Sequence, residues 1–162
     1  MNSKKIILNT FIILAIFLMD RLSKIYILKI AELETKVDVY ITPYLNFYLI
    51  WNKGIAFGLF SFEKLIIYQL ISLVIFTICI VLIFMIVKSE GLKKYALISI
   101  LGGAIGNLFD RMYYTAVPDF IDLHFNGFHW FIFNLADIFI TIGVMCLILD
   151  EIFFYKKNNE IK

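Results

Sequence analysis

Two aspartates stand where a carboxylate is costly, and their setting indicates acid–base chemistry. Asp137 is followed by an apolar run without a charge that extends to Leu149. Asp119 lies in the stretch VPDF, where its immediate neighbours are apolar. Two carboxyl groups that come close in a site of low dielectric constant do not both ionise easily, so one pKa rises and the pair shares a proton near neutral pH.

Such a carboxyl pair can hydrolyse an amide bond. The ionised member takes a proton from water, and that water attacks the carbonyl carbon. The protonated member donates to the carbonyl oxygen, and a proton later reaches the leaving amine. Because the pair titrates as a unit, the sequence assigns the proton to neither residue. Taken alone, Asp137 also has a simpler interpretation, as the N-terminal cap of a helix.

Other chemistries find less support in the sequence. His124 and His129 lie near two aspartates, but their five-residue spacing does not fit the HExxH pattern of zinc peptidases, so no metal site is predicted. No G-x-S-x-G motif and no Walker or dinucleotide-binding glycine pattern occurs, so no cofactor is expected. Cys79 and Cys146 lie in apolar segments and are interpreted as small buried hydrophobic residues.

The composition is that of an integral membrane protein. Of the 162 residues, 62% are hydrophobic, and the mean hydropathy is +0.89, whereas soluble domains average roughly 45–50% apolar residues. The net charge is +2 without a basic stripe, so no nucleic-acid partner is expected. The N-terminal apolar segment mimics a secretory signal, but Asp20, Arg21 and Lys24 stand where a cleavage site of small residues should be, so we interpret it as a span.

Four segments are long enough to span a bilayer, which takes about 20 residues. They cover about residues 6–30, 65–87, 95–114 and 134–155. Lysines concentrate near both termini and between the second and third segments, so the positive-inside rule places both termini in the cytoplasm. We therefore expect an all-α polytopic membrane protein with a single membrane domain over residues 1–162.

Two segments then lie outside the bilayer. Residues 31–64 are rich in β-branched and aromatic side chains, with Pro43, Gly54 and Gly58 as breaks, which predicts a small β-sheet on the membrane surface. Residues 112–132 are predicted to form an outer loop.

With this topology, unusual polar residues from four distant regions of the chain fall at one depth, near the outer boundary. They are Asp20, Lys24, Asn107, Asp110, Arg111, Asp119, Asn134 and Asp137. Ionisable groups at membrane depth indicate a functional site by default. Simpler interpretations stay open: Asp20 and Lys24 can pair with each other at i and i+4, and Arg111 can pair with a nearby carboxylate. Gly102 and Gly106 form a small-xxx-small step that favours close helix packing.

Five motifs, in order along nearly the whole chain, resemble those of the bacterial lipoprotein signal peptidases, the signal peptidase II family. They are DRLSK at 20–24, NKGIAFG at 52–58, GGAIGNLFDR at 102–111, VPDFID at 117–122 and FNLAD at 133–137. One such motif alone is weakly specific, whereas five in order on a four-span chain of this length are highly specific.

The resemblance implies a membrane aspartic peptidase that cleaves signal peptides from prolipoproteins just before a cysteine that carries diacylglycerol. It implies Asp119 and Asp137 as the catalytic dyad, with Asp20 and Lys24 as a supporting polar pair. The positions that match the lining of the site are Asn52, Gly54, Asn107, Arg111, Asn134 and Ala136. It also implies an extracytoplasmic β-cradle and a location in the bacterial cytoplasmic (inner) membrane, with the active site near the outer face. We expect a monomer.

Three positions depart from the family pattern. Phe131 stands where many members have proline, and Arg21 stands where glutamine is common. Pro118 directly precedes the first aspartate of the dyad, where an aliphatic residue is more usual, and it fixes the local backbone and removes one donor.

Two other functions stay open at this point. A small proton- or ion-coupled transporter also carries charged groups within the membrane, but such proteins more often show inverted repeats, and none is visible in the sequence. A non-enzymatic scaffold in which Asp137 only caps a helix predicts that Asp137→Asn leaves function intact, because Asn is also a good cap. The peptidase hypothesis predicts severe loss.

Overall fold

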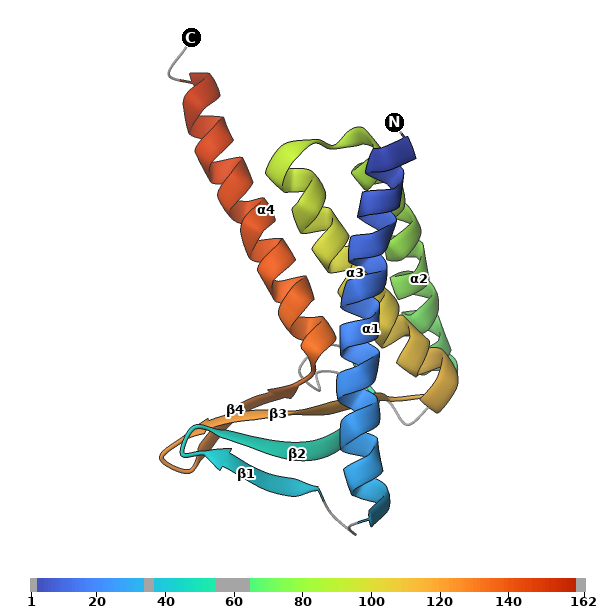
Figure 1. Ribbon diagram of the computed structural model, residues 1–162, viewed down its shortest axis with the longest axis vertical. Helices are drawn as coiled ribbons and strands as arrows, with labels where there is room; N and C mark the ends of the chain where they lie inside the picture. The colour runs from blue at the N-terminus through green and yellow to red at the C-terminus, as the bar shows by residue number, and fades with distance from the viewer. Residues whose placement is uncertain (1–2, 34–36, 55–64, 160–162) are drawn as a thin grey trace.

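A four-stranded antiparallel sheet lies at one end of a bundle of long helices (Figure 1). The computed structural model describes residues 3–33, 37–54 and 65–159. In chain order the elements are α1 (Ser3–Leu33), β1 (Asp38–Thr42), β2 (Leu45–Asn52), α2 (Leu65–Lys88), α3 (Gly91–Tyr114), β3 (Val117–Phe125), β4 (Phe128–Phe133) and α4 (Leu135–Asn159). The start of α1 and the end of α4 both lie away from the sheet (Figure 1).

Helices correspond to all four predicted spans and extend a few residues beyond most of their predicted ends, although α4 begins at Leu135, one residue after the predicted start. Within the described residues, α1 and the Tyr68–Lys88 part of α2 are long and apolar enough to cross a membrane, by length and composition. Helix α3 carries Lys93 and Lys94 near its start and Asp110 and Arg111 near its end. Four membrane spans therefore remain a prediction, although four long helices are present in the described chain.

The outer loop predicted at residues 112–132 is wrong, because most of this segment forms the strands β3 and β4. The strand order is β1-β2-β3-β4, so the small sheet predicted for residues 31–64 is present and also includes the second outer segment. The described fold is therefore four long helices with one small antiparallel sheet. Asn126 and Gly127 form the turn between β3 and β4, with φ of 49° and 78°. This Asn-Gly dipeptide is the usual signal of a two-residue hairpin turn, so the sequence did contain an indication of the hairpin.

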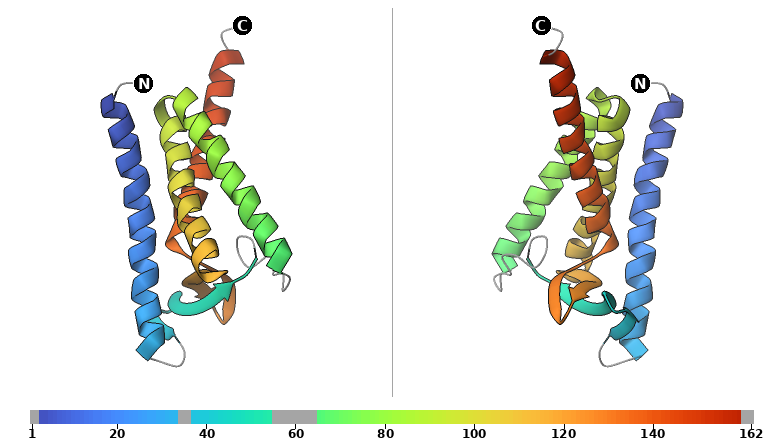
Figure 2. Two further views of the ribbon diagram at one scale, coloured as in Figure 1. Left: turned by 90° about the vertical axis from the view of Figure 1, so that its right-hand side faces the viewer. Right: turned by 90° about the vertical axis from the view of Figure 1, so that its left-hand side faces the viewer.

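Helix α3 is the central helix of the bundle and packs against α1, α2 and α4 (Figure 2). A Cβ atom added at Gly102 would lie 2.8 Å from Cγ2 of Ile16, and one at Gly106 would lie 2.6 Å from Oδ2 of Asp20. Both contacts are with α1, so the predicted small-residue step is confirmed as a site of close helix approach. The same approach brings the polar residues of α1 and α3 together.

One side of the sheet is anchored to the end of α1 by apolar packing. Ile27 of α1 packs with Val37 and Phe120, and all three are buried. The ring of Phe47 on β2 meets that of Phe120 edge to face, with centroids 5.8 Å apart. Because side chains alternate along a strand, the anchoring of Phe120 directs its neighbour Asp119 to the opposite side.

Candidate active site

Asp119 is held by two asparagine side chains that come from different elements. Asn52 ends β2, and its Nδ2 donates to Oδ2 of Asp119 at 2.8 Å. Asn134 directly precedes α4, and its Nδ2 donates to Oδ1 at 2.6 Å. The aspartate is only 1% exposed. Both of its oxygens therefore accept a hydrogen bond, which fixes the plane of a buried carboxyl group.

Asp137 lies in the first turn of α4 and forms a reciprocal cap with Asn134. The backbone N–H of Asn134 donates to Oδ2 of Asp137, and the backbone N–H of Asp137 donates to Oδ1 of Asn134, both at 3.2 Å. This is the capping-box arrangement, in which an N-cap side chain and the third helical residue satisfy each other's N–H groups. The predicted capping role of Asp137 is therefore confirmed, and Asn134 hydrogen-bonds both aspartates.

A third asparagine, Asn107 of α3, connects Asp137 to a buried lysine. Its Nδ2 donates to Oδ1 of Asp137 at 2.8 Å, and its Oδ1 accepts from Nζ of Lys24 at 2.9 Å. Because the lysine can only donate, it orients the amide so that the N–H₂ group faces the aspartate. Lys24 therefore acts on the site through Asn107, without a direct bond to either member of the pair.

Lys24 and Arg21 belong to a buried charge network with two further aspartates. Nζ of Lys24 lies 2.9 Å from Asp20 and 2.7 Å from Asp110, and Arg21 pairs with the same two carboxylates at 3.1 and 2.5 Å. Asp20 also accepts from the backbone N–H of Ala136 at 3.1 Å. That N–H belongs to the first turn of α4 and has no partner within the helix, so Asp20 tethers α4 to α1.

Arg111 supports the site from the other side. Its Nη2 donates to the carbonyl oxygen of Gly54 at 3.1 Å, and its Nη1 donates to the carbonyl oxygen of Asn107 at 3.3 Å. The N–H of Gly54 in turn donates to Oδ1 of Asn52 at 2.8 Å, which leaves the amide of Asn52 facing Asp119. Among the described residues, Arg111 makes no ion pair within 4 Å. The predicted carboxylate pairing of Arg111 is therefore replaced by backbone carbonyl contacts.

Burial raises the pKa of Asp119 from 3.8 to about 6, and the negative charge of Asp137 raises it as well. The hydrogen bonds from Asn134 and Asn52 act in the opposite direction and lower the pKa of this carboxyl. The charge of Asp137 therefore acts on the carboxyl group of Asp119. A carboxyl group that titrates near pH 6 is suited to exchange a proton with a substrate close to neutral pH.

The comparison with protein families agrees with this arrangement. Residues 12–153 match the family described as signal peptidase (SPase) II. The chain belongs to the signal peptidase II family. This membership confirms the resemblance found in the sequence and implies that the chain is a peptidase.

Relatives of the signal peptidase II family match over nearly the whole chain. A lipoprotein signal peptidase of Pelagibacter ubique is 61% identical over 160 residues, which cover 98% of this chain and 96% of the relative. A lipoprotein signal peptidase of Anaplasma phagocytophilum is 36% identical, with 98% of each chain covered. A solved structure titled as a bacterial membrane enzyme at 2.3 Å resolution has a TM-score of 0.74 and 29% identity, and the match covers 95% of this chain and 91% of that chain.

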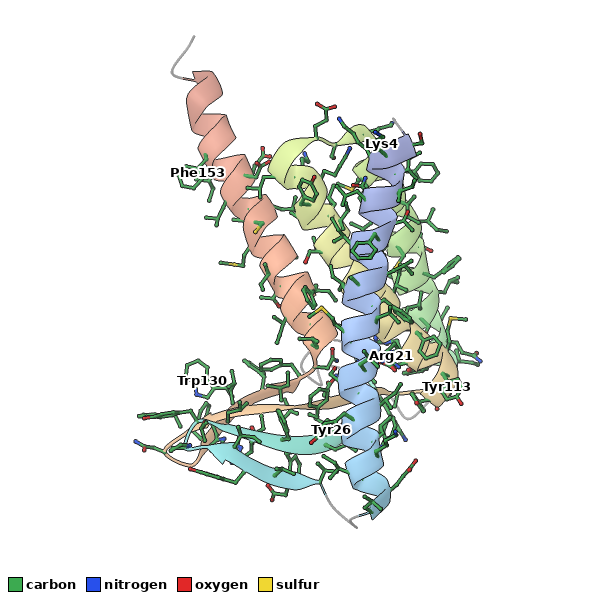
Figure 3. All side chains as sticks on the ribbon, viewed as in Figure 1. Lys4, Arg21, Tyr26, Tyr113, Trp130 and Phe153 are labelled. Carbon is green, nitrogen blue, oxygen red and sulfur yellow. The ribbon has the colours of Figure 1, made fainter. Side chains whose placement is uncertain are left out.

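Every site residue predicted for this member of the signal peptidase II family lies in or next to the network around the two aspartates. Gly54 and Ala136 contribute only backbone groups. Residues 55–58 of the second motif lie outside the described residues. The sequence does not predict a site role for Arg21, which completes the charge network and lies over the ring of Phe109, 5.0 Å from its centroid. Figure 3 shows Arg21 on the half of α1 nearer the sheet.

A hollow of about 240 Å³ opens beside one member of the pair in this signal peptidase II chain. It is lined by Phe133, Asp137, Ile138, Thr141 and Ile142. Apart from the carboxyl and one hydroxyl group, these side chains are apolar. The hollow can therefore receive an apolar segment next to Asp137.

Proposed function

We propose that this chain is a membrane aspartic endopeptidase that removes signal peptides from prolipoproteins, cutting N-terminal to a diacylglyceryl-modified cysteine. The observation that carries the proposal is the position of Asn134, which hydrogen-bonds both Asp119 and Asp137. Family membership and relatives named as lipoprotein signal peptidases support the substrate class.

The proposed chemistry uses the two carboxyl groups as one acid–base pair that holds a single proton. The ionised carboxylate removes a proton from water as the water oxygen attacks the carbonyl carbon, and the protonated carboxyl donates to the carbonyl oxygen. When the tetrahedral intermediate collapses, the C–N bond breaks and a proton moves to the leaving amine. The proposed reaction steps use no metal or cofactor.

Three asparagines hold the two carboxyl groups in the fixed positions that this chemistry needs. Asn52, Asn107 and Asn134 each direct an amide N–H toward one of the carboxyl groups. Amide donors stabilise an ionised carboxylate without adding a full charge, so the negative form remains available in a buried site. Each amide is itself oriented by a partner on its carbonyl oxygen, which limits its rotation.

The membrane setting of the proposal has four spans, both termini in the cytoplasm and the pair near the extracytoplasmic face. It is supported by large apolar side chains exposed on the helices, such as Leu14, Phe84 and Ile142, each at least half exposed. Side chains of this size are rarely exposed over whole helices in water. In this setting the hollow beside Asp137 faces lipid-borne substrate, and the chain acts as a monomer.

Cleavage of a synthetic prolipoprotein peptide by the purified chain in detergent tests the proposal. One substrate carries diacylglycerol on the cysteine, and the matched control is the same peptide with a free thiol. We expect mass spectrometry to show a single cut directly before the modified cysteine and little or no cutting of the control. No cleavage of either peptide by folded protein, or equal cleavage of both, would contradict the proposed substrate class.

A further inference from the structure

A second cluster of chemically active side chains lies on the β3–β4 hairpin, apart from the two aspartates of the candidate active site. Asp122 and His124 are two residues apart on β3, and His129 of β4 is the cross-strand partner of His124. One ligand atom from each of the three residues lies within 4.8 Å of the other two. The five-residue spacing, which excluded a helical zinc motif, places the two imidazoles opposite each other across a hairpin.

The carboxylate of Asp122 is almost fully buried and faces two imidazoles. Nδ1 of His129 lies 2.8 Å from Oδ2 of Asp122, and Nδ1 of His124 lies 3.7 Å from the same oxygen. The side chain of Asp122 is 3% exposed, so its negative charge calls for a positive partner in this environment. Nδ1 of His124 is buried and has no hydrogen-bond partner among the described residues.

The cluster borders a hollow that is lined mostly by polar side chains. Its volume is about 380 Å³, and Asp38, Asn46, Tyr48, Asp122 and His129 contribute to its wall together with one isoleucine. Oδ1 of Asn46 is buried and finds no hydrogen-bond partner within the part of the chain that the structure describes. Asn46 is also the cross-strand neighbour of Asp122, so a fourth candidate ligand, an amide oxygen, lies next to the cluster.

We propose that Asp122, His124 and His129 bind one divalent transition-metal ion of the zinc type. Two imidazoles and one carboxylate are a common ligand set for Zn²⁺, and a fourth position remains for water or an oxygen ligand. The ion replaces the direct contact between His129 and Asp122 and places a positive charge beside the buried carboxylate. His129 is 57% exposed, so its ring has room to move toward the ion.

The position of this site on the hairpin gives the ion a structural effect on the candidate active site. Strand β3 carries Asp119 three residues before Asp122, and β4 leads directly into Asn134. An ion bound to both strands holds them together near the turn at Asn126 and Gly127. It stabilises the segment that connects the two aspartates, while the hydrolytic chemistry proceeds without it.

Zinc binding by the full chain in detergent tests this inference. The protein is prepared without a histidine tag, treated with a chelator and titrated with Zn²⁺ alone. Because the chain has two histidines, ¹⁵N-histidine labelling reports on the two imidazoles and little else. We expect binding of one equivalent, changes in both imidazole signals and a higher melting temperature, whereas Mg²⁺ has none of these effects because it prefers oxygen ligands.

Variants separate a specific site from loose binding. His129→Gln alters an exposed side chain, so the variant is expected to fold, and it should weaken Zn²⁺ binding by at least about tenfold. Asp122→Asn should do the same, with Asp150→Asn as the matched control. Absence of saturable binding at micromolar Zn²⁺, or equal binding by wild type and His129→Gln, would overturn the proposal.

Discussion

The side-chain amide of Asn134 donates a 2.6 Å hydrogen bond to Oδ1 of Asp119. The same residue is the N-cap of α4 and shares a reciprocal cap with Asp137. A single asparagine thus ties the strand that carries one aspartate to the helix that carries the other. The geometry of the proposed dyad depends on how α4 begins.

Two substitutions of Asn134 separate its two roles. Asn134→Ser keeps an N-cap acceptor but does not reach Asp119, whereas Asn134→Ala loses both functions. We expect both variants to lose roughly 10- to 100-fold in kcat/KM, since a hydrogen bond to a charged group is lost. Only the alanine variant should also lose about 1 kcal/mol of stability. Thermal unfolding and cleavage assays check this, and full activity of the serine variant would contradict the role in positioning Asp119.

The raised pKa of Asp119 predicts a pH-dependent stability. Because the pKa in the folded protein is about 6 and the ordinary value is 3.8, the folded state binds the proton more tightly than the unfolded state. The contribution of this group to stability is therefore complete below about pH 3.8 and is lost as pH rises through about 6.

The matched variant for this effect is Asp119→Asn, which stays neutral at every pH. We expect the variant to become more stable relative to wild type as pH rises from 4 to 7. The difference between their melting temperatures should therefore increase, by an amount that corresponds to about 1–3 kcal/mol of unfolding free energy. Differential scanning calorimetry in detergent measures the difference. A difference that stays constant across this range would show that Asp119 has no raised pKa.

Loss of the buried lysine should damage both stability and the site. Lys24→Met leaves the carboxylates of Asp20 and Asp110 without one of their two cations, and breaking a buried pair costs about 3–5 kcal/mol. Lys29→Met, at an exposed position on the same helix, is the control and should behave like wild type. Thermal unfolding in detergent checks this, and a Lys24→Met variant as stable as Lys29→Met would refute the network.

Gly106→Ala tests whether the contact between α1 and α3 positions α4. The added methyl group would lie 2.6 Å from Oδ2 of Asp20, a carboxylate already bound to Arg21, Lys24 and the N–H of Ala136. We expect a loss of about 1–3 kcal/mol and reduced activity, because the carboxylate of Asp20 must shift from the position in which it accepts from the N–H of Ala136.

Gly102→Ala is the comparison for this variant, because the three atoms nearest to the added methyl group all belong to the apolar side chain of Ile16. It should lower the melting temperature but leave kcat near the wild-type value. Equal kcat values for Gly102→Ala and Gly106→Ala, measured below both melting temperatures, would argue against a special role of Asp20.

Much of the site could be predicted from the sequence, because it depends on residue types at characteristic spacings. The apolar runs predict the helices, and the polar residues at one depth, with the family motifs, point to Asp119 and Asp137. The contacts of Asn134 and Asp20 could not be predicted, since they depend on how α4 meets β3 and α1. Such contacts join residues far apart in the chain, and no local pattern encodes them.

The strands of the second outer segment, residues 112–132, could not be predicted for a different reason. Residues Val117–Phe125 do not alternate cleanly between apolar and polar, because the strand buries Asp119 and Asp122 as well as apolar side chains. Strand periodicity therefore gave no signal, and only the Asn126-Gly127 turn indicated a hairpin. Once the hairpin is recognised, the pairing register of β3 and β4 places His124 opposite His129.

The central claim is that Asp119 and Asp137 act together as the catalytic pair. The most direct measurement is kcat for cleavage of a diacylglyceryl-modified prolipoprotein peptide by wild type, Asp119→Asn and Asp137→Asn. Asp150→Asn, in the second half of α4, is the control. Asparagine keeps a side-chain oxygen at position 137 that can accept from the backbone N–H of Asn134, so folding should be preserved. The account predicts that each dyad variant loses at least about 10³-fold in kcat while the control stays near wild type. Near-normal cleavage by either folded dyad variant would contradict it.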